Sequence, residues 1–401
     1  MTRNVWLFSI LLILLVPGIA TSQKKAEREL VSSLEQHLVA LGPAEDTLTP
    51  SGARPRAYLA AQFKALGLVP RGHNHTYAEA TVLDKGRRFE PGTSFAINGH
   101  ALSPGTDFVP LSFSGTATVR GTPLVAVQER KQPWIMDLGN YFDTPPAPGV
   151  LRDSLYSLAR QAVADQASAV VFYQSKATIP DLSFDDAANT QPLTIPVVYV
   201  TSTASSRYLS DPTASVAVQL EVSITPDRDT AYTLMAGIDH GAPTTAIIAA
   251  SSPDDKAMLI ELARLLKDDR KFGRENYLFV AFPPGAKRSP AMQSFTRHLP
   301  EEAGKPGCLL FLNGAGGATL TLRGAGSSSG WQPLLDRVKE RTPARQIDTD
   351  GKPGLEIPGV AGLSFTGSGP GTGDATADAA TVRFVESLLE NINRRGNPTA
   401  H

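Results

Sequence analysis

The half of the chain from residue 226 onward alternates short apolar runs with amphipathic runs, and this alternation restricts the fold more than any other feature. Spacing and composition predict strands at 232–238, 245–250, 277–282, 309–312 and 318–322, and helices at 253–266, 331–341 and 377–394. Strands that alternate with helices are typical of a sheet covered on both faces. Such sheets carry their ligand sites at the carboxyl ends of the strands. We therefore look for functional residues directly after each predicted strand.

The middle of the chain has a different pattern. Short β-rich runs occur at 109–113, 123–127, 169–173 and 195–201, with one amphipathic helix at 151–165, and residues 214–222 lead back toward the main domain. This pattern predicts a separate small α/β domain. Before it, helical spacing at 26–41 and 56–66 predicts two helices, whereas residues 72–105 have no clear period. We expect four parts: a signal peptide at 1–22, the first part of the main domain at 23–105, an inserted domain at 106–225, and the rest of the main domain at 226–401.

The N-terminus resembles a secretory signal. An apolar run at 5–20 follows Arg3. The small residues Ala20, Thr21 and Ser22 at its end suit cleavage before residue 23. A retained membrane anchor is the alternative, because the run is only slightly shorter than a bilayer requires. Cys308 is the single cysteine, so an exported chain would fold without an internal disulfide. We expect a periplasmic or extracellular protein.

The overall charge excludes some partner classes. The chain of 401 residues has 38 basic and 39 acidic residues and a formal net charge of −1, so it has no strong field to attract nucleic acid or an anionic membrane. We expect neither as a partner once the signal is cleaved. The expected partner is a peptide or protein ligand whose identity the sequence does not give.

Several segments together resemble one enzyme family. They are the run Tyr-Leu-Ala-Ala-Gln-Phe-Lys-Ala-Leu-Gly-Leu at 58–68, the predicted strand at 245–250 with its helix, the run at 276–282, and the run Leu-Arg-Gly-Ala-Gly-Ser-Ser-Ser-Gly-Trp at 322–331. In order and spacing they resemble the di-zinc aminopeptidases, peptidase family twenty-eight of the metallopeptidases. The middle domain resembles the protease-associated domain that many members carry. The resemblance implies a mixed central sheet with helices on both faces and an inserted small α/β domain.

The resemblance also implies a site. Family members bind two zinc ions through histidines and carboxylates at the strand ends, and a glutamate acts as general base. At the first motif this chain has Ser251 in place of the zinc-binding histidine, and most of the following loop is absent. Asp254 and Asp255 are either remnants of the acidic loop or the ordinary acidic first turn of a helix that Ser252 caps.

The remaining motifs have lost their metal-binding side chains as well. Gly285 and Ala286 stand in place of the adjacent Glu-Glu that supplies the base and one ligand, and Asn313 stands in place of a ligand Asp. In the last two motifs Gly351, Gly369 and Gly373 stand in place of histidines. We expect no cofactor, although the resembled family uses zinc, because neutral or absent side chains are poor zinc ligands.

The sequence supports two hypotheses of different classes. The first is a catalytically inactive aminopeptidase homologue that works as a binding or scaffold protein. The alternative is an active hydrolase. It would be either a metallo-aminopeptidase with a rearranged metal site or a metal-free enzyme that uses Asp254, Asp255, His240 or Asp350. Two other motifs carry less weight.

The glycine-rich runs at 313–317 and 367–373 lack the residues of a phosphate-binding loop, so we expect them to be slack loops left after ligand loss. His73 and His75 lie in a predicted exposed loop with no third metal ligand nearby in the sequence. We expect neither motif to form a functional site.

Overall fold

The protein divides into two compact units. A computed structural model describes residues 16–42, 53–176, 179–185, 190–283, 290–317, 319–341, 347–348, 351–368 and 374–398. The first unit combines Met1–Leu83 with Thr230–His401, and the second is Asp84–Asp229. The second unit therefore begins before the predicted boundary at 106. Residues 84–105, which have no clear period, form strands that pair within the second unit.

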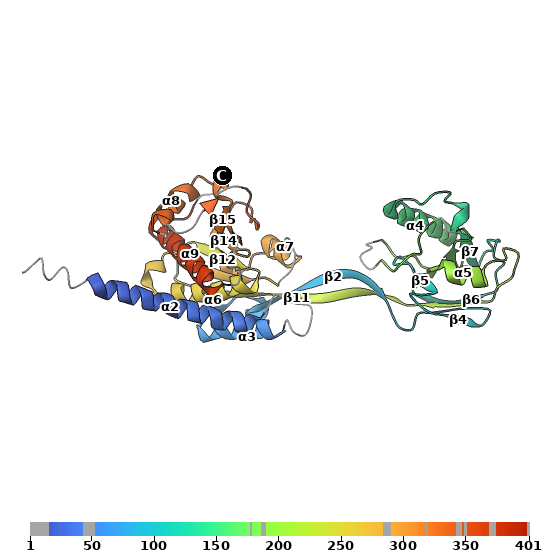
Figure 1. The fold of residues 1–401 in the computed structure, drawn as a ribbon, viewed down its shortest axis with the longest axis horizontal. Coiled ribbons are helices and arrows are strands. Elements are labelled where there is room, and N and C mark those ends of the chain that lie inside the picture. The colour runs from blue at the N-terminus through green and yellow to red at the C-terminus, as the bar shows by residue number, and fades with distance from the viewer. Residues whose placement is uncertain are drawn as a thin grey trace, which may run out of the picture. The chain divides into compact units, whose positions relative to one another are not determined.

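A mixed sheet forms the centre of the first unit, which confirms the predicted fold class (Figure 1). In the described part of the chain it has nine strands in the order β1–β11–β13–β12–β14–β17–β15–β16, with β2 also paired to β11. Their bounds are β1 (Val69–Pro70), β2 (Ala78–Phe89), β11 (Ile224–Ile238), β12 (Thr245–Ala250), β13 (Asn276–Ala281), β14 (Pro306–Leu312), β15 (Thr319–Arg323), β16 (Ile347–Asp348) and β17 (Ala361–Ser368). Strands β13, β12, β14 and β17 run parallel, so their carboxyl ends meet at one edge, which we call the strand-end edge.

Helices cover both faces of this sheet. They are α2 (Val16–Leu41), α3 (Ala53–Ala65), α6 (Pro253–Asp268), α7 (Pro290–Arg297), α8 (Trp331–Arg341) and α9 (Ala375–Arg395). Neighbouring residues of β12 face opposite sides, so Ile248 packs with α2, α6 and α9, while Ile247 packs in a second core with Phe295 of α7. Both faces of β12 are buried, which explains its continuous apolar sequence.

A buried charged network ties α2 to α6. Glu261 of α6 has a side chain that is 1% exposed, and it accepts hydrogen bonds from Ser33 Oγ (2.5 Å) and His37 Nε2 (3.1 Å). The Arg264 guanidinium donates to the same carboxylate at 2.6 and 2.9 Å. Burial alone would raise the pKa of Glu261, but these hydrogen bonds and the Arg264 charge outweigh it and lower the pKa to about 2.

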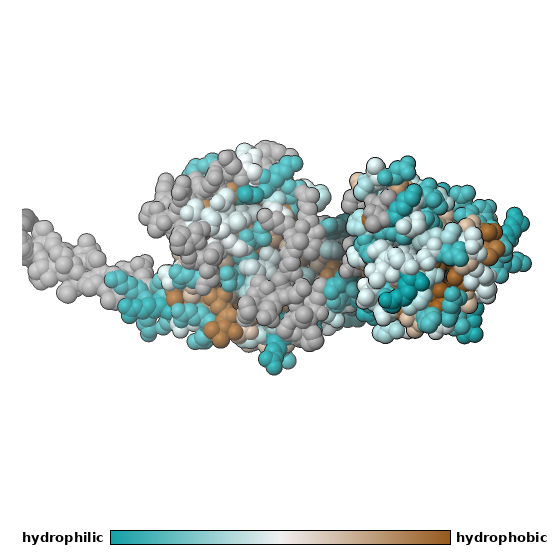
Figure 2. Space-filling view, turned by 45° about the vertical axis from the view of Figure 1, so that its right-hand side comes forward, coloured by the Kyte–Doolittle hydropathy of each residue, from teal (hydrophilic) through white to brown (hydrophobic). Residues whose placement is uncertain are grey.

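The second unit contains two small sheets. One is antiparallel, in the order β4 (His100–Leu102), β3 (Ser94–Ile97), β10 (Val218–Val222) and β6 (Ala117–Gly121). The other has the order β5 (Phe108–Pro110), β9 (Val197–Val200), β8 (Ala169–Tyr173) and β7 (Pro133–Asp137), with helices α4 (Pro148–Ala164) and α5 (Ser202–Tyr208) in the same unit. On the face seen in Figure 2, hydrophilic surface predominates and apolar patches are small.

The predicted strand at 123–127 is wrong. This segment forms only an isolated bridge between Leu124 and Ser215, and the strands β6 and β7 lie on either side of it. Pro123 has no N–H to donate to a ladder, and the polar residues from Gln128 onward end the apolar run. Short 3₁₀ turns complete the described elements: η2 (His73–His75), η3 (Leu138–Asn140), η4 (Arg270–Phe272), η5 (Glu301–Ala303) and η6 (Ala325–Ser327).

Most of the predicted signal peptide lies outside the described residues, which begin at Val16. Residues 16–22 form the first turns of α2. Within the described segments, every helix is too short or too polar to cross a lipid bilayer.

Candidate functional site

Two of the predicted site residues meet at the strand-end edge. Ser251 follows the last residue of β12, and Asn313 follows the last residue of β14, its parallel neighbour. Ser251 is 8% exposed, and its Oγ donates a long hydrogen bond of 3.4 Å to Asn313 Oδ1. The structure thus brings together the two positions that the resemblance assigns to a histidine ligand and an aspartate ligand. In their place stand a hydroxyl and an amide, both neutral.

Asp255 is the buried carboxylate of this edge, and backbone groups occupy both of its oxygens. Its Oδ2 accepts from the N–H groups of Ser252 (3.1 Å) and Gly314 (2.8 Å), and its Oδ1 accepts from Ala315 N–H (2.9 Å). Ser252 Oγ accepts from Asp255 N–H in return, which completes a capping box. Asp255 therefore starts α6 and fastens it to the loop after β14. Of the two hypotheses for this residue, the geometry matches the helix start.

The two neighbours of Asp255 in the first turn of α6, Asp254 and Lys256, have shifted pKa values. Burial, together with the Asp255 charge, raises the pKa of Asp254. Burial also lowers the pKa of Lys256 to about 8, although the same charge opposes this shift. Lys256 was missed from the sequence, because a lysine after two acids in a first turn looks like an ordinary solvated residue. Neither side chain makes a hydrogen bond or ion pair with another described residue.

Two described glycines of this edge, Gly314 and Gly367, have structural reasons to be glycine and are not slack. Gly367 N–H donates to Gly314 O at 2.6 Å, and a Cβ on Gly367 would lie 1.5 Å from Gly316 O. Gly314 has a φ of 69°, a conformation that favours glycine. The loop after β14 and strand β17 therefore pack so closely that only glycine fits at position 367. This corrects the expectation that the two glycine-rich runs are slack, as far as their described residues go.

The other candidate positions do not join this group. Gly351 comes after β16 in the chain, and its carbonyl accepts from the N–H of Gly324 at 2.8 Å, which places it beside the end of β15. Because β15 is antiparallel to β17, that end points away from the strand-end edge. The remaining candidates, Gly285, Ala286, Asp350, Gly369 and Gly373, lie outside the described residues.

His240 lies near the amino end of β13, at the opposite end of the strands from the strand-end edge. It follows β11, whose last residue Ile238 pairs with Tyr277 at the start of β13. Strand β13 has six residues, so about 17 Å of strand separates His240 from the strand-end edge. Its ring packs edge-on against Tyr277 at 6.1 Å, and its Nε2 is buried without a hydrogen-bond partner in the described structure. His240 therefore cannot act together with Asp254 and Asp255.

The described residues of the strand-end edge do not fit a zinc site. Zinc takes thiolate, imidazole and carboxylate ligands in tetrahedral sets. Here the side chains are those of Ser251, Asn313 and Asp255, and three backbone N–H groups already donate hydrogen bonds to Asp255. In the described ranges, three or more histidine, cysteine, aspartate or glutamate side chains do not come close enough anywhere to hold a metal ion.

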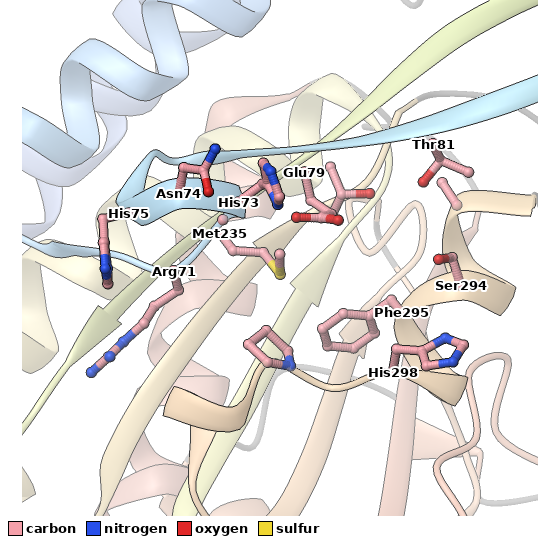
Figure 3. Close-up of a pocket in the computed structure, with 14 residues that line it drawn as sticks. Arg71, His73, Asn74, His75, Glu79, Thr81, Met235, Ser294, Phe295 and His298 are labelled. Carbon is pink, nitrogen blue, oxygen red and sulfur yellow. The ribbon is translucent and has the colours of Figure 1, made fainter.

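A pocket of about 690 Å³ lies beside this edge on the β11 side (Figure 3). Met235 of β11 pairs with Val280 near the end of β13, which places the pocket next to the strand-end edge. The residues that line it come from three segments: Arg71, Gly72, His73, Asn74, His75, Glu79 and Thr81 from the chain before and within β2, Thr233 and Met235 from β11, and Ala291, Ser294, Phe295, His298 and Pro300 from α7 and the residues after it. The sequence predicts an exposed loop at His73 and His75. Both are exposed, but they also line this pocket.

The second unit has a smaller, mostly apolar pocket of about 210 Å³. Leu111, Phe113, Leu151 and Leu155 are among its lining residues. It provides a second concave surface on the described part of the chain.

Comparisons with known proteins found similar solved structures but no matching family model or curated protein. The solved structures similar to it include a zinc aminopeptidase from Bacillus subtilis, with 15% identity, 90% of this chain and 94% of that one covered, and a TM-score of 0.44. An aminopeptidase from Aneurinibacillus sp. strain AM-1 has 11% identity, 94% coverage of both chains and a TM-score of 0.43. A peptidase M28 precursor from Shewanella amazonensis has 13% identity, 94% and 98% coverage, and a TM-score of 0.43.

Proposed function

We propose that this chain is an exported, non-catalytic relative of the zinc aminopeptidases that binds a peptide or protein ligand. The observation that carries the proposal is the state of the strand-end edge. Its buried carboxylate, Asp255, is occupied by backbone N–H groups, and the neighbouring positions are the neutral Ser251 and Asn313.

The chemistry of peptide hydrolysis supports the same conclusion. A zinc peptidase needs a metal-bound water and a carboxylate base that removes its proton. Glycine and alanine have no side-chain donor, so Gly285, Ala286, Gly369 and Gly373 supply neither ligand nor base wherever their loops lie. The alternative hydrolase built on Asp254, Asp255 and His240 is disfavoured, because His240 stands at the opposite edge of the sheet.

The pockets of the structure support a binding role. The pocket beside the strand-end edge has the volume of a typical ligand site and combines buried apolar side chains with exposed polar ones. We further propose that the second unit is a protease-associated domain and that its apolar pocket is a second contact for the ligand. Fold alone does not imply activity, so a peptidase-like sheet without its donors is consistent with a binding role.

An aminopeptidase assay tests the proposal. Purified protein is supplied with zinc and an aminoacyl anilide such as leucine p-nitroanilide, with and without a chelator. We expect no chelator-sensitive cleavage above the buffer blank. Cleavage that a chelator abolishes and zinc restores would overturn the proposal. The Ser251→Ala, Asn313→Ala double variant is the control, since a contaminating peptidase would give the same rate with it.

Export is tested separately by N-terminal sequencing of protein recovered from the exported fraction. Cleavage at the predicted site would leave Gln23 as the first residue. Protein that stays in the membrane fraction with residues 1–22 attached would favour the anchor instead.

A further inference from the structure

We propose that the pocket beside the strand-end edge binds a basic side chain, lysine or arginine, of the peptide or protein ligand. This inference rests on the proposed binding function and names the chemistry that the ligand presents. It depends on the walls of the pocket, on the one acidic side chain that lines it, and on the loop that shapes its rim.

The pocket has an apolar floor and polar walls. Met235 of β11 is 3% exposed and Phe295 of α7 is 5% exposed, and both line the cavity. In Figure 3, Glu79 and His73 lie on one side of the space, and Phe295 and His298 lie on the facing side. A bound side chain would therefore contact apolar surface along its stem and polar groups at its head.

The unpaired charge in this pocket is negative. The carboxylate of Glu79 is half-buried and makes no hydrogen bond or ion pair with another described residue. Apart from the histidines His73, His75 and His298, the basic residue among the described lining residues is Arg71, whose guanidinium is already paired with Asp239 at 2.5 Å. Arg71 extends across Gly237, where a Cβ would lie 2.8 Å from Arg71 Nε, and it points away from Glu79 in Figure 3. Glu79 therefore has no ion-pair partner among the described residues.

Only a cation on an apolar stem satisfies both parts of the pocket. Lysine and arginine place methylene groups against apolar surface while the charged head stays polar. Over Phe295 and Met235 the stem would be buried, and Glu79 would accept charge-assisted hydrogen bonds from the head. An acidic side chain would be repelled by Glu79, and a purely apolar one would desolvate this carboxylate without giving it a partner.

The rim of the pocket is held in one conformation before any ligand arrives. Gly72 N–H donates to Thr76 O at 2.7 Å, and Thr76 Oγ1 donates to His73 O at 2.8 Å. Between them Asn74 and His75 have φ values of 51° and 58°, which are uncommon for residues other than glycine. Such conformations persist only where the surrounding contacts enforce them. A rim fixed in this way loses little entropy on binding.

Calorimetric titration of the full chain with capped tripeptides tests the inference. The probes are N-acetyl-Ala-Arg-Ala-amide and the same peptide with citrulline, which keeps the shape of arginine but not its charge. We expect the wild type to bind the arginine peptide about tenfold more tightly than the citrulline peptide. The free energy of a hydrogen bond to a charged group corresponds to a factor of this size in Kd. N-acetylated peptides are poor substrates for an aminopeptidase, so the result does not depend on whether the protein has peptidase activity.

Three variants make the test specific. Glu79→Gln should abolish the preference for arginine over citrulline. Glu79→Lys should reverse the charge selectivity, so that N-acetyl-Ala-Glu-Ala-amide binds more tightly than the arginine peptide. Glu35→Gln is the matched control, because Glu35 is an exposed acid on α2, which packs on the other face of the sheet, and it should leave the preference unchanged.

Each other outcome overturns the inference. Equal binding of the arginine and citrulline peptides by the wild type would show that the charge is not recognised. A preference that survives in Glu79→Gln would place the recognition elsewhere. Absence of binding by either peptide up to about 10 mM, which corresponds to less than about 3 kcal/mol of binding free energy, would show that the pocket does not take a basic side chain.

Discussion

Asp255 and Glu79 are two carboxylates of the same unit, and their surroundings are opposite. Asp255 has no exposed surface, and three backbone N–H groups donate to it. Glu79 lines an open pocket and has no partner among the described residues. The difference shows what each can do. A buried carboxylate that accepts three backbone hydrogen bonds stabilises the fold, whereas a carboxylate over an apolar floor without a described partner is available to a ligand.

The largest expected effect comes from removing the buried carboxylate of Asp255. Asp255→Ala leaves the N–H groups of Gly314 and Ala315 buried without acceptors and breaks the capping box, so it should destabilise the protein by about 3 kcal/mol or more. Glu79→Gln should change stability by no more than about 0.5 kcal/mol. Urea unfolding followed by circular dichroism measures both. Similar losses for the two variants would break the comparison.

A third carboxylate, Glu261, extends the comparison, because its hydrogen bonds and ion pair make the stability of the protein depend on pH. Its pKa lies near 2 in the folded protein, below the ordinary value of 4.5. A lowered folded-state pKa means that the stabilisation is fully present above about pH 4.5 and is lost as the pH falls toward 2. The shift corresponds to about 3 kcal/mol. Stability of wild type and Glu261→Gln should therefore differ at pH 6 and converge near pH 2 to 3. A difference that does not depend on pH would contradict the assigned network.

The rim of the pocket gives a smaller effect. In Gly72→Ala the new Cβ would lie 2.6 Å from backbone atoms of Ala78, so the loop must shift, at a cost of about 2 kcal/mol. Affinity for the arginine peptide should fall as well. Gly326→Ala is the control in the same unit, because nothing lies within 4 Å of its Cβ and its φ is not positive. Thermal unfolding and peptide titration measure the two effects, and equal behaviour of both variants would argue against a fixed rim.

The smallest effect is expected at Ser251. Its hydrogen bond to Asn313 is 3.4 Å long, so Ser251→Ala should cost less than about 1 kcal/mol and leave peptide binding unchanged. The variant is compared with wild type in the same urea experiment. A loss above about 2 kcal/mol, or a loss of peptide binding, would mean that Ser251 has a role beyond this weak contact.

The sequence predicted the elements with continuous apolar runs. Strands 169–173 and 245–250 and the helix at 331–341 have the predicted bounds, because their patterns are uninterrupted. Strand β17 was missed, since Gly362 and Gly367 lower strand propensity. Position 367 requires glycine because the carbonyl oxygen of Gly316, in the loop after β14, would lie 1.5 Å from a Cβ there. That contact has no signal in the local sequence.

The candidate site was predictable in part for a similar reason. The Ser252-Pro253-Asp254-Asp255 run predicts a capped helix start, which the structure contains. The hydrogen bonds from Gly314 and Ala315 were not predictable, because these residues are about 60 positions away in the chain. The pocket was missed altogether. Its walls come from the segment before β2, from β11 and from α7, and no spacing rule connects these segments.

The most direct test of the central claim is the zinc content of the purified protein. The protein is dialysed against a small excess of zinc, the free metal is removed, and zinc per chain is measured by atomic emission. If backbone groups have taken over the carboxylate of the strand-end edge, zinc should stay well below one ion per chain and should not change in Asp255→Asn. One or two tightly held zinc ions per chain, lost on substitution at Ser251 or Asn313, would contradict the account.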